Sequence, residues 1–324
     1  MTNTKLLLAL GVLLVCPALV FDSPYLINLG IIALSYAVIT SNWDVLFGCA
    51  GVWSFGQLGF LGIGLYTTAI LTTFYQVSPW LAIVIGCVLS ALAGAGIGVV
   101  TLRLRGVYLA LVTVGFMEIL TVIIINFFTF SLGTTYRVID IPPLQIQSMT
   151  FDQYNGLPYF YTAIGIFLLS TFANRAILKS RIGLAFRAMR DSEARARSLG
   201  VNTTNLKLLS FLVSAIFTSM IGSFYAHYYS LADTDLFSWS SLTINFIIMT
   251  IGGWGTFYGP MIASMIWVFL DQALELTGLW RELIEGLIVI ILLILVPRGI
   301  MNPMKRGYSY VLSRLTRLRR AHTT

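Results

Sequence analysis

The chain has 324 residues, of which 57% are apolar and only 10% are charged. A soluble domain carries about 25% charged residues, so this composition excludes an ordinary water-soluble globular protein and predicts an integral membrane protein. The formal net charge of +7 does not by itself indicate nucleic acid binding, because membrane proteins collect Lys and Arg in their cytoplasmic loops.

Ten apolar stretches follow one another along the chain and are candidate membrane helices, which need roughly 20 residues each. Turn-like breaks such as Asp22-Ser23-Pro24 and Ser78-Pro79 separate them. The predicted spans cover residues 5–21, 25–47, 55–75, 80–101, 107–130, 158–174, 207–229, 237–254, 260–277 and 283–297. The sequence therefore predicts an all-α integral membrane protein with about ten transmembrane helices.

The first stretch, residues 5–21, fits either a cleaved signal peptide or a retained helix. We expect a retained helix, because the next apolar segment begins only a few residues later. The cysteines Cys16, Cys49 and Cys87 match no zinc, haem or redox motif, so no metal site is expected.

Charge placement orients the spans. Between Arg175 and Lys207 lie eight basic and two acidic residues, and seven further basic residues follow from Arg298 to Arg320. Four predicted spans separate the two clusters, so both fall on the same side, which the positive-inside rule makes the cytoplasm. Both termini are then predicted to be cytoplasmic.

This orientation divides the chain. Residues 1–300 are expected to form a single transmembrane domain with a cytoplasmic loop at about 175–207, and residues 301–324 a basic cytoplasmic tail. The first five spans run from inside to outside and the second five run back, a parity that permits an inverted 5+5 repeat. The two halves show no convincing sequence match.

The central loop between spans 6 and 7 contains a predicted short helix from Ser192 to Leu199. Asp191 is the expected N-cap, Glu193 complements the helix dipole in the first turn, and Gly200 ends the helix. One interpretation is a solvated basic loop that only sets topology.

The apolar side chains of Leu184, Phe186, Met189 and Leu199 favour another interpretation. A short helix that carries apolar residues among charges suits docking into a groove on a partner protein.

Five stretches together carry a family resemblance. They are Gly51–Tyr66 (GVWSFGQLGFLGIGLY), Leu102–Glu118 (LRLRGVYLALVTVGFME), Ser180–Phe211 (SRIGLAFRAMRD, then LGVN and KLLSF), Ile251–Pro260 (IGGWGTFYGP) and Pro297–Gly299 (PRG). In this order, and over most of the chain, the sequence resembles the permease subunits of branched-chain amino-acid ABC importers (LivM-like).

The resemblance implies that the short loop helix is a coupling helix seated on a nucleotide-binding subunit. The residues then expected to touch that subunit are Arg187, Arg190, Asp191, Glu193, Ala194, Leu199 and Gly200. The run Glu193-Ala-Arg-Ala-Arg197 is more basic than is usual for the family.

A glycine-rich entry to the third span predicts close helix packing or a broken helix that lines a path. Ser54 and Gln57, which lie among Gly51, Gly56 and Gly59, favour the path.

Glu118 lies 11 residues past Val107, about 16 Å along a helix, near the middle of a roughly 30 Å core. It is either a pathway residue or a structural hydrogen-bonding group. Asp44 is expected near a cytoplasmic helix end, close to water, and His227 near the outer end of its span.

The motifs of enzymes are missing from the sequence. It has no phosphate loop, no His-Glu-x-x-His metal motif, and only two histidines, His227 and His322. The chain is therefore expected not to be an enzyme and to bind no cofactor, with its energy coming from partners or from an ion gradient. The resemblance implies ATP and Mg²⁺ on partner ATPases.

The resemblance implies a subunit of the bacterial inner (plasma) membrane. Its expected partners are two ATP-binding-cassette subunits, a second homologous permease in a heterodimer, a periplasmic or extracellular solute-binding protein and membrane lipid, with no nucleic acid. Branched-chain or other hydrophobic amino acids are the expected cargo, with urea or short amides as the alternative. An alternative of another class is a stand-alone ion-coupled secondary transporter that uses Glu118 as a proton site.

Overall fold

The structure is a computed structural model that describes residues 23–104, 106–129, 137–146, 149–151, 156–275, 280–295 and 299–300. The predicted first span at residues 5–21 and the predicted basic tail at residues 301–324 lie outside the described residues.

Long helices dominate the described part of the chain. In order they are α2 (Pro24–Asp44), α3 (Gln57–Thr73), α4 (Pro79–Val100), α5 (Val107–Phe127), α6 (Leu157–Lys179), α9 (Thr203–Tyr229), α10 (Trp239–Gly252), α11 (Gly259–Glu275) and α12 (Arg281–Leu295). α2 continues into a π-helical turn, η1 (Val45–Cys49), and α4 into a 3-10 turn, η2 (Thr101–Arg103). Each of these helices overlaps one predicted span.

Proline stands at the first or second position of four of these helices, as Pro24, Pro79, Pro158 and Pro260. The first helical turn has no intrahelical partner for its N–H groups, so the missing N–H of proline costs nothing there.

Five helical segments among the described residues are long and apolar enough to cross a membrane. They are Pro24–Cys49, Pro79–Arg103, Val107–Phe127, Leu157–Lys179 and Thr203–Tyr229. α3, α10, α11 and α12 contain 17, 14, 17 and 15 residues, fewer than the roughly 20 of a straight span. The all-α membrane protein is confirmed, while ten crossings and the inverted repeat stay predictions.

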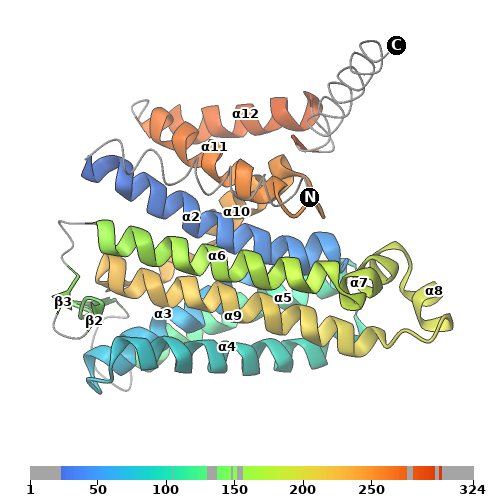
Figure 1. The fold of residues 1–324 in the computed structure, drawn as a ribbon, viewed down its shortest axis with the longest axis horizontal. Helices are drawn as coiled ribbons and strands as arrows, with labels where there is room; N and C mark the ends of the chain where they lie inside the picture. The colour runs from blue at the N-terminus through green and yellow to red at the C-terminus, as the bar shows by residue number, and fades with distance from the viewer. Residues whose placement is uncertain are drawn as a thin grey trace, which may run out of the picture.

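The core forms where α3 packs against α4 and α9, and where α2 packs against α6 and α11 (Figure 1). Glycines permit the closest approach: a side chain at Gly64 would overlap the backbone of Ser219, and one at Gly222 would overlap the backbone of Leu61. Small residues let helix backbones approach closely where lipid supplies no hydrophobic driving force. A hydrogen bond from Thr68 to Ser223 adds a polar link between α3 and α9.

The two ends of the bundle differ. Two short helices, α7 (Arg181–Asp191) and α8 (Glu193–Ser198), project from one end, and the strands β2 (Gln145–Ile146) and β3 (Met149–Thr150) lie at the other (Figure 1). β1 (Val138–Ile139) pairs antiparallel with β4 (Leu231–Ala232), just before the 3-10 turn η4 (Thr234–Phe237).

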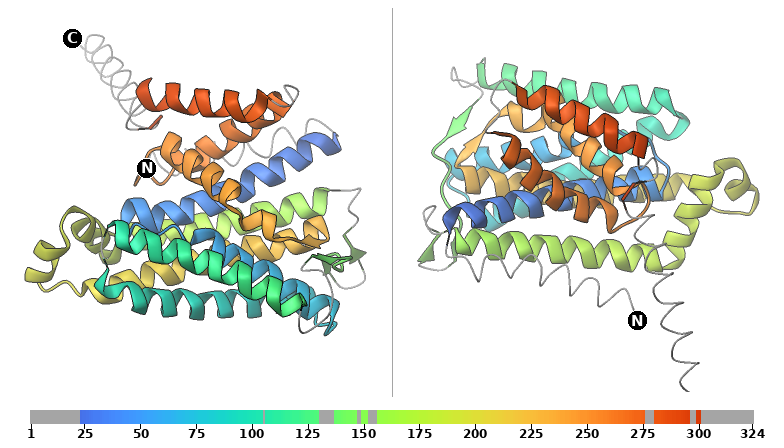
Figure 2. Two further views of the ribbon diagram at one scale, coloured as in Figure 1. Left: turned by 180° about the vertical axis from the view of Figure 1, so that it is seen from behind. Right: turned by 90° about the horizontal axis from the view of Figure 1, so that it is seen from above.

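α5 lies along one edge of the bundle (Figure 2). Its outward face is apolar and exposed, with Tyr108, Leu111, Ile119 and Ile123 among the exposed side chains. Such a face suits lipid or another membrane protein rather than water.

Candidate functional site

The α7–α8 segment begins with a sharp corner after α6. Ser180 ends α6, and its hydroxyl accepts a hydrogen bond from the N–H of Ile182 at 3.1 Å, which caps α7. A side chain at Gly183 would overlap the backbone of Leu178, so the corner is as tight as glycine permits. The loop predicted to lead into the coupling helix is therefore itself helical.

α7 is amphipathic, and its apolar face is buried. Phe186 and Met189 pack in one cluster with Val45 and Leu46 of η1 and with Leu109 of α5. The apolar residues of the loop therefore divide into two groups. Phe186 and Met189 hold α7 on the membrane helices, whereas Leu184 and Leu199 are exposed.

α8 is close to the predicted short helix, but its cap differs. It spans Glu193–Ser198, and its N-cap is Ser192, whose hydroxyl accepts from the N–H of Arg195 at 3.4 Å. Asp191, the predicted cap, is instead the last residue of α7. The prediction was wrong here because two good capping residues stand side by side, and the sequence does not show which one leaves the helical conformation.

Glu193 fixes α8 to α9. Its carboxylate lies 2.9 Å from Nη2 of Arg197 and 3.0 Å from Nζ of Lys207, whose side chain is only 7% exposed. The 3.0 Å pair joins α8 to the second turn of α9, a helix long enough to cross the membrane.

Six of the seven predicted contact residues are exposed. These are Arg187, Arg190, Asp191, Ala194, Leu199 and Gly200. The seventh, Glu193, is turned inward toward Lys207. The structure thus separates six exposed residues from one anchored residue, a distinction that the sequence does not indicate.

Arg190 joins α7 to the segment after α2. Its Nη1 donates to the carbonyl oxygen of Gly48 at 3.1 Å. Gly51, which has a φ of 74°, packs against the backbone of Arg190. A Cβ at Gly51 would lie 2.8 Å from the Cα of Arg190. Gly51, predicted as a pathway residue, is therefore a close-approach point beneath α7.

Asp44 extends this contact to the second half of the chain. It is buried at the end of α2, and its carboxylate accepts from the N–H of Gly255 at 2.6 Å and of Phe257 at 3.4 Å. The expectation that Asp44 would be close to water was wrong, because backbone N–H groups replace water as its partners. We call Asp44, Gly48, Arg190 and Gly255 the junction.

The turn beside the junction is tied to α6. Nη1 of Arg175 donates to the Tyr258 hydroxyl at 3.1 Å. Burial raises the pKa of Tyr258, more than the nearby Arg175 guanidinium lowers it, so the phenol stays neutral near pH 7. α2, α6, α7 and the α10–α11 turn thus meet at one end of the bundle, as their predicted placement on one side requires.

The predicted pathway residues before α3 are buried and hydrogen-bonded. Gln57 donates to Thr218 and accepts from the Ser214 hydroxyl at 2.7 Å, so it bridges α3 and α9. The carbonyl of Ser54 accepts from the indole of Trp43 at 2.7 Å. A Cβ at Gly56 would lie 2.9 Å from the carbonyl oxygen of Thr113. In this conformation the segment that leads into α3 is non-helical and tightly packed.

Glu118 stands apart from these residues. It is half-buried on α5. Within the described part of the chain it makes no hydrogen bond or ion pair, so the structural hydrogen bond that was one of its two interpretations is missing there.

His227 lies in the last turn of its helix, α9, where the sequence places it. It is buried, and its Nδ1 lies 2.6 Å from the carbonyl oxygen of Pro142. It therefore holds the loop before β2 against α9.

Comparison with known proteins identifies relatives along most of the chain. The sequence model of the family described as branched-chain amino acid transport system / permease component matches residues 25–297. The high-affinity branched-chain amino acid transport system permease proteins LivM of Salmonella typhimurium and Escherichia coli are each 28% identical over 301 residues, 86% of this chain and 70% of the relative.

A more distant relative is the nucleoside ABC transporter permease protein NupC of Lactococcus lactis subsp. cremoris. It is 24% identical over 86% of this chain and 93% of its own length. No solved structure matches significantly.

Proposed function

Because the chain belongs to the family of branched-chain amino acid transport permease components, we propose that it is the transmembrane subunit of an ATP-driven importer, in which α7 and α8 receive the motion of partner ATPases. The observation that carries this proposal is the double attachment of the α7–α8 segment. Arg190 donates a hydrogen bond to the carbonyl oxygen of Gly48, in the turn that follows α2, and Glu193 forms an ion pair with Lys207 on α9.

The attachment leaves a free surface for a partner. Leu184 and Leu199 are 68% and 80% exposed on the same projecting segment, and Arg187 and Ala194 are exposed beside them. Apolar side chains ringed by charges are typical of a docking surface. In our proposal a nucleotide-binding subunit covers them, with ATP and Mg²⁺ on that subunit.

In our proposal the junction passes the motion of the partner ATPases on to the membrane helices. A push on α7 acts through Arg190 on the segment after α2, and through Asp44 on the α10–α11 turn. Tightly packed elements transmit small shifts because packed interfaces have discrete arrangements. Gly51, Ser54, Gly56 and Gln57 lie where that shift would reach the entry of α3, and we propose that they line the path in another state.

Branched-chain amino acids are the proposed cargo, since the LivM relatives carry that name. We further propose a second permease chain in the assembly, a solute-binding protein that delivers the cargo from outside, cytoplasmic termini, and location in a bacterial inner membrane. The exposed apolar face of α5, with Glu118 on that helix, is the proposed side of the second permease.

Reconstitution tests the proposal. The chain, its permease and ATPase partners and its binding protein are placed in proteoliposomes, and uptake of radiolabelled leucine is measured. We expect uptake that requires ATP and the binding protein. Uptake that follows a proton gradient without ATP, and that Glu118→Gln abolishes, would instead establish the stand-alone secondary transporter.

A further inference from the structure

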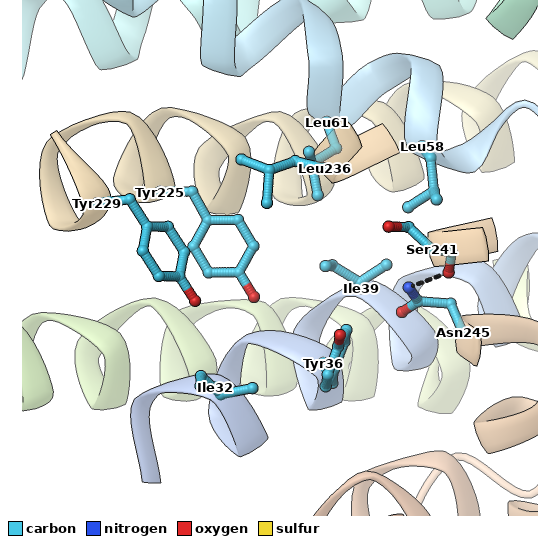
Figure 3. Close-up of a pocket in the computed structure, with 10 residues that line it drawn as sticks. All are labelled: Ile32, Tyr36, Ile39, Leu58, Leu61, Tyr225, Tyr229, Leu236, Ser241 and Asn245. Atoms are coloured by element: carbon cyan, nitrogen blue, oxygen red, sulfur yellow. Dashed lines mark hydrogen bonds between the residues drawn. The ribbon is translucent and has the colours of Figure 1, made fainter. Parts of the chain in front are cut away.

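A small cavity of about 60 Å³ lies among α2, α3, η4, α9 and α10 (Figure 3). Tyr225 and Tyr229, from the last two turns of α9, line it together with Ile32 from the first half of α2. The cavity therefore lies in the part of the bundle away from α7 and α8. Since one water needs about 10–15 Å³ measured in this way, the cavity has room for about four waters and is too small for an amino acid.

The wall of the cavity is partly apolar and partly polar. Aliphatic side chains make up half of the described lining, and residues with a hydroxyl group supply most of the rest: Tyr36, Tyr225, Tyr229 and Ser241. This lining contains no Asp, Glu, Lys, Arg or His. A bare ion that enters such a site loses its hydration without gaining an opposite charge, so the wall suits a neutral occupant.

Asn245 contributes an acceptor that needs a partner. It is 1% exposed, and its Nδ2 donates to the carbonyl oxygen of Ser241 at 2.8 Å. Among the described residues nothing donates to its Oδ1, and Figure 3 shows this oxygen on the cavity side of the carboxamide. A buried acceptor without a partner costs free energy, and a water that donates an O–H here removes that cost.

Ser241 lies one turn before Asn245 on the same helix and offers a second acceptor. Its hydroxyl donates to the carbonyl oxygen of Asp235 at 3.1 Å, so its proton is already used and its lone pairs are left to accept. The tyrosine hydroxyls of the wall can both donate to a water and accept from it. A buried water makes about three hydrogen bonds, and this combination of groups supplies them.

We propose that the cavity is a binding site for a cluster of about four water molecules, one of which donates to Oδ1 of Asn245. The waters join α10 to the tyrosine hydroxyls of α2 and α9, because a bridging water holds two polar groups nearly as well as a direct hydrogen bond does. The site lies within one chain and needs neither ATP nor a partner, so it goes beyond the proposed transport function.

Radiolytic footprinting tests for this water, because hydroxyl radicals formed from water inside a protein oxidise the side chains beside it even where they are buried. The full chain in lipid nanodiscs is exposed to X-rays, and the oxidation rate of each tyrosine is measured by mass spectrometry. Tyr225 is 5% exposed and lines the cavity, whereas Tyr66 is 3% exposed, packs against Phe128 and Phe237, and is not among the lining residues. We expect Tyr225 to be oxidised severalfold faster than Tyr66. Equal rates overturn the proposal.

A variant that removes the acceptor locates the water. Asn245→Leu keeps the side-chain size and should lower the oxidation rate of Tyr225 severalfold, because the water loses the group that most needs it. Asn126→Leu is the matched control, since Asn126 makes the same 2.8 Å bond to the carbonyl four residues back, but on an exposed part of α5. It should leave the rate of Tyr225 unchanged.

A second pair of variants keeps the test decisive even if Asn245→Leu does not fold. Ser241→Ala removes the other acceptor of α10 and should also lower the rate of Tyr225, by less. Thr243→Val removes a hydroxyl on the exposed side of the same helix and should have no effect.

An unchanged rate of Tyr225 in a folded Asn245→Leu protein, or in Ser241→Ala if only that variant folds, overturns the assignment. Because no ATPase is present, failure here says nothing against the proposed importer, and failure of ATP-driven uptake says nothing against this site.

Discussion

Oδ1 of Asp44 accepts a hydrogen bond from the backbone N–H of Gly255, with 2.6 Å between the heavy atoms of residues 211 positions apart. The contact joins the end of α2 to the α10–α11 turn, next to the side chain of Arg190. A carboxylate can accept several hydrogen bonds, and here it takes two from a turn whose own geometry leaves those N–H groups unpaired. Asp44 therefore organises the junction rather than facing water.

Replacing Asp44 should destabilise the folded chain. Asp44→Ala removes the acceptor for two N–H groups, which costs about 1–3 kcal/mol for each buried group left unpaired, and it opens a space beneath Arg190. Asp44→Asn keeps one acceptor oxygen and should be less harmful. The measurement is thermal unfolding of the detergent-solubilised chain. Asp235→Asn is the control, since its carboxylate is 77% exposed, and an equal loss in both variants would contradict the role of Asp44.

Gly51 offers a test of close packing separate from backbone strain. Gly51→Ala places a Cβ 2.8 Å from the Cα of Arg190 at a φ of 74°, so it both strains the backbone and displaces α7. Gly106 has a φ of 56° but nothing within 4 Å, so Gly106→Ala carries the strain alone. We expect Gly51→Ala to lose about 2 kcal/mol or more, clearly exceeding Gly106→Ala, and to reduce ATPase activity stimulated by the binding protein. If Gly51→Ala and Gly106→Ala lose equal stability, α7 moves away from the added Cβ without a measurable cost.

These positions also show how much of the fold and of the candidate site can be predicted from the sequence. Apolar runs and prolines locate the helices to within a few residues, because span length and the missing N–H of proline are local properties. The docking role that we propose for α7 and α8 is predicted from the apolar residues Leu184 and Leu199 in a basic loop. The junction could not be predicted: Asp44 bonds to backbone N–H groups, and backbone partners have no side-chain signature. Gln57 was similarly ambiguous, because its bonds to Ser214 and Thr218 depend on how α3 and α9 pack.

Glu193 should act as an anchor rather than as a surface contact. Glu193→Gln removes the charge that pairs with Lys207, whose side chain is 7% exposed, and a nearly buried ammonium without its partner is costly, up to about 3 kcal/mol. α8 should then detach from α9, and co-purification of the ATPase should fall together with thermal stability. In Leu199→Ala, by contrast, stability should be unchanged while co-purification falls, because Leu199 is 80% exposed. A Glu193→Gln protein of full stability would refute the anchor.

The bridging role of Gln57 can be tested by removing its hydrogen-bond partners together with it. Gln57→Leu leaves the buried Thr218 hydroxyl without its amide partner, whereas the Ser214 hydroxyl keeps its 3.1 Å bond to the carbonyl oxygen of Asn42. The folded chain should therefore lose about 1–3 kcal/mol. The triple variant Gln57→Leu, Thr218→Val, Ser214→Ala removes the three side-chain polar groups of the bridge, and the Asn42 carbonyl keeps its backbone partner at the end of α2. It should regain part of that stability, because unpaired groups rather than lost bonds dominate the cost. If Gln57 also lines the path in another state, uptake of leucine will stay impaired in the stable triple variant. Full recovery of uptake with stability would confine Gln57 to the joint between α3 and α9.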